Sequence, residues 1–122
     1  MSEIIKRYQD TISLIKSNIE NNQNLKFPKI IAVSKTFKLE KILPLIDHGH
    51  IDYGENKVQE AGEKWKSIKE KKPNIKLHLI GRLQTNKVKF AIKIFDYIHS
   101  LDSIKLAKKI ADEEKKQNKK IQ

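Results

Sequence analysis

The sequence predicts a parallel α/β fold, and the spacing of its strand-like runs is the main reason. These runs begin at residues 29, 50, 76 and 96 as KIIAVS, HIDYG, KLHLI and DYIHS, and a fifth strand could begin near KKIQ at residue 119. The starts lie roughly 20 to 26 residues apart, which leaves room for a strand and a crossover helix. Helical patterns fill the gaps, and no linker or low-complexity tract separates a second domain. We therefore expect a single domain over residues 1–122.

Apolar spacing and capping residues predict the helices in chain order. A first amphipathic helix is predicted over residues 3–21, and NNQNLKFP ends it. The apolar residues at helical spacing that predict it are Ile4, Ile5, Tyr8, Ile12, Ile15 and Ile19. Asn56 and Gln59 are typical of a cap and its third-position partner at the start of a helix. Asp102 or Ser103 can cap the last helix. Its predicted apolar face is Ile104, Leu106, Ala107, Ile110 and Ala111.

Composition limits the classes of function. The chain has no cysteine and no apolar stretch near the roughly 20 residues that span a membrane, so we expect a soluble protein without membrane partners, located in the cytoplasm. The formal net charge of +11 suggests nucleic acid. Only Arg7 and Arg82 are arginines, however, and lysine lacks the planar fork that reads phosphates and guanines. A solvated lysine-rich surface is the favoured interpretation, with a basic nucleic-acid-binding module as an alternative.

In parallel α/β folds the functional groups gather where strands end and helices begin. The residues at these ends are Ser34, Lys35 and Thr36; Gly54, Glu55 and Asn56; Gly81, Arg82, Gln84 and Asn86; and His99 and Ser100. Lys35 stands out, because an amine at the mouth of an apolar strand is partly desolvated, which frees its lone pair for Schiff-base chemistry. Any single lysine in so lysine-rich a chain has a strong competing interpretation as a surface residue.

The other motifs are weaker. No G-x-G-x-x-G, phosphate loop or G-x-S-x-G is present, so neither a nucleotide fingerprint nor hydrolase chemistry is supported. His48 and His50 are more typical of a helix end and a loop than of a metal site, and we predict no metal. His78 lies inside a strand, where a hydrogen-bonded interior or face residue is expected.

Four stretches of the chain together resemble, in order and spacing, the motifs of the pyridoxal phosphate homeostasis protein family. They are IAVSKT, DYGENKVQEAGEK, HLIGRLQTNKVK and IHSLDSIKLAKKI. That family is similar to the N-terminal barrel domain of alanine racemase. The resemblance covers roughly residues 3 to 117 and implies the N-terminal half of a TIM-type (β/α) barrel, with about four strand-helix units preceded by an N-terminal helix. Tyr53 and Lys57 depart mildly from the family pattern.

The resemblance implies that Lys35 forms an aldimine with pyridoxal 5′-phosphate and that Asn56 lies beside this cofactor. His78, Gln84, Asn86, Lys87 and Ser100 match positions that line or support the same mouth, and of these His78 and Ser100 are predicted to bind the cofactor. The implied function is cofactor binding in vitamin B6 and amino-acid homeostasis, without clear turnover. A racemase or lyase acting on amino acids is an alternative.

The family barrel continues beyond the length of this chain, and its later loops supply the groups that hold the cofactor phosphate. For the 122 residues alone, the sequence therefore predicts open sheet edges, an uncovered apolar inner face and either self-association or loose packing.

Overall fold

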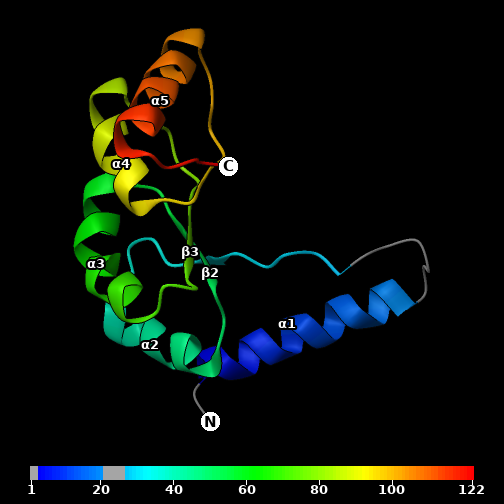
Figure 1. Cartoon of the computed structure of the whole chain (residues 1–122). Helices are drawn as coiled ribbons and strands as arrows, with labels where there is room; N and C mark the ends of the chain where they lie inside the picture. Colours follow the sequence, from blue (N-terminus) through cyan, green and yellow to red (C-terminus); the bar gives the residue numbers. More distant parts are fainter. Residues whose placement is uncertain (1–2, 21–26) are drawn as a thin grey trace.

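The computed structural model describes residues 3–20 and 27–122, which form a four-stranded parallel sheet with helices between the strands (Figure 1). The strands are β1 Ala32–Val33, β2 Asp52–Glu55, β3 Lys76–Leu79 and β4 Tyr97–Ile98, paired in the order β1-β2-β3-β4. The helices are α1 Glu3–Glu20, α2 Leu39–His48, α3 Val58–Lys71, α4 Val88–Ile94 and α5 Ile104–Gln117, with the 3-10 helix η1 Thr85–Lys87 before α4. The predicted strands are confirmed, and the arrangement is half of a TIM-type barrel.

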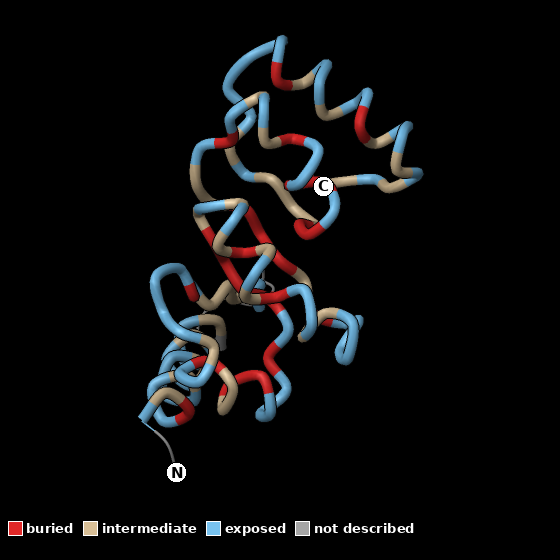
Figure 2. Tube along the Cα trace, turned by 90° about the vertical axis from the view of Figure 1, so that its left-hand side faces the viewer, coloured by how far each residue is buried: buried red, intermediate tan, exposed pale blue. Residues whose placement is uncertain are grey.

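The four crossover helices α2 to α5 follow one another along one side of the sheet, whereas α1 packs on α2 and points away from the other helices (Figure 1). The main core lies between the sheet and these helices. Its fully buried members include Tyr53 and Leu77 from the strands and Trp65 from α3. In Figure 2 buried positions alternate with exposed ones along the helices. None of the described helices is long and apolar enough to cross a membrane.

The alternation of side chains along the strands separates a face toward the helices from an inner face. Tyr53 and Glu55 of β2 contact α3 through Trp65, whereas Asp52 and His78 lie on the inner face and bind each other. The register places Gly54 beside His78, and His78 beside Tyr97, on this inner face. The inner face, which was expected to be apolar, therefore also carries a polar cluster.

Both edges of the sheet show how a barrel would continue. At the β4 edge, Gln122 donates a backbone hydrogen bond to Asp96 and accepts one from Ile98, at 3.1 and 2.8 Å. This is the hydrogen-bond pattern of a parallel neighbour, so the chain begins to pair where a fifth strand was predicted. At the other edge, β1 borders a cavity of about 410 Å³ between α1 and α2, with Ile4, Val33 and Phe37 among its lining residues.

The helix predictions are confirmed in position and corrected in detail. Ser103 caps α5, its side-chain oxygen accepting a hydrogen bond from the Leu106 backbone N–H at 3.1 Å, but Ile104 and Ala111 of the predicted apolar face are exposed. The predicted cap of α3 is wrong, because the helix begins one residue later: Lys57 is its N-cap and makes no side-chain capping bond. The predicted end of the first helix in residues 21–26 lies outside the described residues.

We expect the 122-residue chain to self-associate through its β1 edge. Phe37 is 54% exposed beside this edge, and an unpaired parallel strand next to apolar surface favours pairing with another chain. Sedimentation should give a mass above the 14.3 kDa of one chain. Phe37→Asp should lower that mass, whereas Phe90→Asp, at an equally exposed phenylalanine on α4, should leave it unchanged. A monomer at all concentrations would contradict the prediction.

Candidate functional site

The carboxyl ends of the four strands form one mouth, in which a row of inner-face residues continues the register of the sheet. Backbone hydrogen bonds extend past the strands from Ser34 to Gly54, from Ile80 to Glu55 and from His99 to Leu79, at 2.9 to 3.0 Å. Continuing the register by these bonds aligns Asn56, Ile80 and His99 across the mouth, and Lys35 lies in the turn directly after β1. Two of the predicted site residues, Lys35 and Asn56, thus follow the ends of the neighbouring strands β1 and β2.

Lys35 lies in a tight turn whose backbone is fixed on both sides. The Phe37 N–H donates to the Ser34 carbonyl at 3.2 Å, and the Thr36 N–H donates to Glu60 at 2.9 Å. Thr36 has φ of 67°, in the left-handed region that a β-branched residue rarely adopts. The Lys35 side chain is exposed, and its amine has no hydrogen bond or ion pair within the described part of the chain. The expected partial desolvation of Lys35 is therefore not found, but its amine is free to react.

A buried carboxylate anchors this turn to the sheet and to α3. Glu55 is fully buried and accepts hydrogen bonds from the Ser34 hydroxyl, from the Lys64 amine at 3.1 and 3.2 Å and from the Trp65 indole at 3.2 Å. Lys64 also donates to the Ser34 backbone carbonyl at 2.8 Å. These partners satisfy the hydrogen-bonding capacity of the buried Glu55 carboxylate, which therefore holds the turn that carries Lys35 in place.

Asn56 has an unpaired side-chain oxygen at the end of β2. Its Oδ1 atom is buried and has no hydrogen-bond partner among the described residues. The backbone at Gly81 approaches so closely that a Cβ there would lie 2.7 Å from the Asn56 carbonyl oxygen, which is why glycine is required. A buried polar atom without a partner costs free energy, so this oxygen is an available acceptor for a group outside the described residues.

Ser100 links the loop after β4 to the loop after β3. Its hydroxyl donates a short hydrogen bond to the Gly81 carbonyl, and Gly81 in turn contacts Asn56. The loops after β2, β3 and β4 are therefore linked through Gly81. By strand alternation, the neighbouring His99 is the residue of this loop that lies on the inner face. Sequence reasoning named His99 as a strand-end residue but did not select it, because only the register shows which of the two points inward.

His78 is the centre of the polar cluster on the inner face. Its Nε2 lies 2.8 Å from the Asp52 carboxylate and its Nδ1 lies 3.0 Å from Nε2 of His99. Its ring stacks on Tyr97 with centroids 4.2 Å apart, and the Tyr97 hydroxyl accepts a hydrogen bond from Lys29 at 3.1 Å. The predicted hydrogen-bonded strand histidine is confirmed. Its network was not predicted, because these partners lie on different strands.

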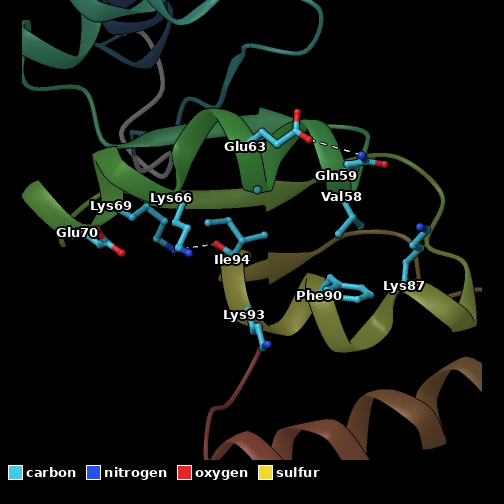
Figure 3. A pocket seen from close by; sticks show the side chains of 11 residues that line it. Val58, Gln59, Glu63, Lys66, Lys69, Glu70, Lys87, Phe90, Lys93 and Ile94 are labelled. Atoms are coloured by element: carbon cyan, nitrogen blue, oxygen red, sulfur yellow. Dashed lines mark hydrogen bonds between the residues drawn. The ribbon is translucent and has the colours of Figure 1, made fainter.

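The remaining predicted residues divide between the mouth and other surfaces. Gln84 and Asn86 are exposed around η1, and Lys87 lines a groove of about 740 Å³ between α3 and α4. In Figure 3, Val58, Phe90 and Ile94 line this groove together with lysine and glutamate side chains. The groove lies in the outer helix layer and contains neither Lys35 nor Asn56. His48 ends α2 and His50 follows it in the loop, where His50 contacts the Tyr8 hydroxyl and the Asp52 carbonyl.

No family model matches the chain, but individual proteins do. It is 35% identical over 110 residues to the pyridoxal phosphate homeostasis protein of Haemophilus influenzae, covering 86% of this chain and 46% of that protein. It is 42% identical over 101 residues to the protein of the same name in Buchnera aphidicola, covering 79% of this chain and 44% of the relative. The chain corresponds to the N-terminal half of the pyridoxal phosphate homeostasis protein family.

Solved structures agree with this relationship to the pyridoxal phosphate homeostasis proteins. PipY of Synechococcus elongatus PCC7942, solved with PLP bound, matches with a TM-score of 0.69 and 33% identity, over 85% of this chain and 49% of PipY. PipY without PLP matches with a TM-score of 0.72 and 32% identity, over 90% of this chain and 50% of PipY. The chain thus spans about half the length of the curated relatives and solved structures that it matches.

Proposed function

We propose that this chain binds pyridoxal 5′-phosphate at the mouth of the half barrel, with the amine of Lys35 joined to the cofactor aldehyde as a Schiff base. The observation that carries the proposal is that a free, exposed lysine amine and the buried, unpaired side-chain oxygen of Asn56 follow the ends of neighbouring strands. A cofactor with an aldehyde and adjacent polar ring substituents fits this pair of groups, because an amine adds to the aldehyde while an amide binds a polar neighbour.

The other predicted residues take supporting roles in this proposal. His78 contributes through the network beneath the mouth, and Ser100 holds Gly81 against Asn56. The bound cofactor supplies an electrophilic aldehyde and an electron-withdrawing ring. The protein supplies the amine, its rigid turn and the groups that surround it.

The biological role that we propose is cofactor binding in vitamin B6 and amino-acid homeostasis, in the cytoplasm and without substrate turnover. Support comes from the names of the relatives and from the PLP-bound PipY structure. Residues 1–122 would be a partial cofactor-binding barrel domain, because the family resemblance assigns the phosphate contacts to later loops. We therefore expect residues 1–122 by themselves to bind the cofactor more weakly than the longer relatives.

The test is direct labelling of the chain. The protein is mixed with pyridoxal 5′-phosphate, reduced with borohydride and digested, and the modified peptide is identified by mass spectrometry. Selective modification of the peptide that contains Lys35 supports the proposal. Labelling spread evenly over the exposed lysines would refute it, because it would show that no site selects the cofactor.

Asn56→Ser should weaken cofactor binding several-fold without changing stability. The serine hydroxyl is shorter and cannot reach as far into the mouth, and Asn56 does not cap α3, so no capping energy is lost. We expect the free energy of unfolding to stay within about 0.5 kcal/mol of the original. Asn74→Ser, in the exposed turn before β3, is the matched control. Unchanged affinity and spectrum in Asn56→Ser would remove Asn56 from the site.

A further inference from the structure

Glu60 binds the backbone directly beside Lys35, although the two residues come from different helix and strand units. Glu60 lies in the first turn of α3, which follows the end of β2, and β2 pairs with β1. Its Oε1 atom accepts a hydrogen bond from the Thr36 N–H at 2.9 Å. The same oxygen lies 3.4 Å from the Lys64 amine, one helical turn further along α3. The turn after β1 is therefore tied to α3 by a carboxylate.

The conformation of Thr36 explains why such a tie is needed. Its φ of 67° lies in the left-handed region, where a β-branched side chain is disfavoured. A residue persists in such a conformation only where the surrounding contacts fix it. The N–H that Glu60 binds belongs to the peptide unit that joins Lys35 to Thr36. The bond therefore fixes the orientation of that unit, and with it the backbone from which the Lys35 side chain extends.

The charge of Glu60 strengthens this tie. The hydrogen bond from the Thr36 N–H lowers the pKa of Glu60, against the opposing effect of partial burial, and Lys64 and Lys57 lower it further. Glu60 is therefore ionised at neutral pH, and a hydrogen bond to an ionised acceptor is roughly twice as strong as a neutral one. Lys64 also donates to Glu55 and to the Ser34 carbonyl, so Glu60 belongs to the same network as the buried anchor of the turn.

A fixed backbone at Lys35 matters because the chain is rich in competing amines. It has 26 basic residues, and all except Arg7 and Arg82 are lysines. An aldehyde can react with any exposed lysine amine, so exposure does not distinguish Lys35 from the others. What distinguishes it is a turn that is held in one conformation beside the unpaired side-chain oxygen at the end of β2. Fixing a reacting group relative to a second binding group raises its effective concentration toward a shared ligand.

We propose that Glu60 is a positioning residue that makes Lys35 the preferred lysine for the cofactor, by holding the peptide unit between Lys35 and Thr36 in place. This role rests on the proposed function, because it concerns which amine joins the cofactor aldehyde. The amine nitrogen of Lys35 bonds to the aldehyde carbon, and the aldehyde oxygen leaves as water with the two amine hydrogens. Glu60 acts through the backbone and takes no part in that step.

The first test measures the Thr36 amide in the protein without cofactor. Glu60→Ala removes the acceptor, so hydrogen exchange of this amide, followed by NMR, should become about tenfold faster, as expected for loss of a hydrogen bond to a charged group. Glu60→Gln loses the charge and the ion pair with Lys64 but keeps an acceptor oxygen, so its exchange should stay closer to the original rate. Equal exchange in the original chain and in Glu60→Ala would overturn the proposal.

The second test measures which lysine captures the cofactor. After borohydride trapping of pyridoxal 5′-phosphate, the share of label on Lys35 relative to the other exposed lysines should fall about tenfold in Glu60→Ala, the cost of a modest loss of positioning. Glu60→Gln should restore most of that share. Glu63→Ala, at an exposed glutamate one turn further along α3, is the matched control and should label as the original does.

The outcomes separate this role from the proposed function. Selective labelling of Lys35 that is the same in the original chain and in Glu60→Ala would overturn the role of Glu60 and leave the cofactor site intact. An equal loss in Glu60→Ala and Glu60→Gln would also overturn it, because the charge and not the bond to Thr36 would then be responsible. Absence of selective Lys35 labelling in the original chain would overturn the cofactor site itself, whatever the Thr36 amide shows.

Discussion

Lys35→Ala is expected to abolish the covalent attachment of pyridoxal 5′-phosphate, seen as loss of both the visible absorbance band and the borohydride-trapped peptide. The reason is that the Lys35 amine is the reacting group of the proposed site, so its removal leaves nothing to join the aldehyde. Stability should be unchanged within about 0.5 kcal/mol, because the side chain is exposed and unpaired in the described structure. Absorbance titration and peptide mapping measure the effect.

Lys38→Ala is the matched control for this experiment. Lys38 is an exposed lysine three positions further along the same loop, and its side chain makes no capping bond to α2. It should bind and trap the cofactor as the original chain does. If the band survives in Lys35→Ala and another lysine carries the label, the site lies elsewhere. Lys64 and Lys69 are poor substitutes, because buried or half-buried ion pairs with Glu55 and Asp96 already engage their amines.

The sheet was predictable from the sequence because each strand is a short local pattern at a regular interval. The runs from residues 29, 50, 76 and 96 became adjacent parallel strands in chain order, and even the last residue pairs where a further strand was expected. Parallel strands joined by crossover helices leave few alternative topologies. The position of Lys35 at a strand end followed from that regularity alone.

The polar details were harder to predict, because they depend on register and on contacts between distant segments. Asparagine is a residue type typical of a helix cap, yet Lys57 and not Asn56 occupies that position, and the Oδ1 atom of Asn56 stays unpaired. Ser100 was favoured over His99 at the end of β4, but the serine binds the Gly81 carbonyl and the histidine joins the polar cluster on the inner face. A shift of one residue along a strand exchanges the two faces, so only the paired sheet distinguishes these neighbours.

Glu55 shows the same limitation at the level of stability. In the sequence, Glu55 is one glutamate among many charged residues, and it belongs to the stretch DYGENKVQEAGEK that resembles a family motif. In the structure it is fully buried toward the helices and joins β1, β2 and α3 through Ser34, Lys64 and Trp65. Its role is to fix the backbone that carries Lys35. Of the substitutions considered, we therefore expect replacement of Glu55 to lower the free energy of unfolding most.

Glu55→Ala should destabilise the chain by about 3–5 kcal/mol, because it leaves the largely buried Lys64 amine without its main counterion and the Trp65 N–H without an acceptor. A domain of this size has only about 5–15 kcal/mol in total, so the loss removes a large share of the stability and should clearly lower the urea midpoint. Trp65 is the only tryptophan, and its fluorescence during urea titration reports on this contact.

One further variant separates loss of the Glu55 charge from loss of its side chain, and a second serves as the control. Glu55→Gln keeps an acceptor for Trp65 but removes the charge opposite Lys64, so its midpoint should fall between those of the original and Glu55→Ala. Glu63→Ala, at an exposed glutamate of α3, the helix that carries Lys64 and Trp65, should unfold as the original does. If Glu55→Ala unfolds at the same urea concentration as Glu63→Ala, the carboxylate is not the anchor of the Lys35 turn. The rigidity of that turn would then have to come from the Glu60 bond to the Thr36 backbone and from the bonds of Phe37 and Lys64 to the Ser34 carbonyl.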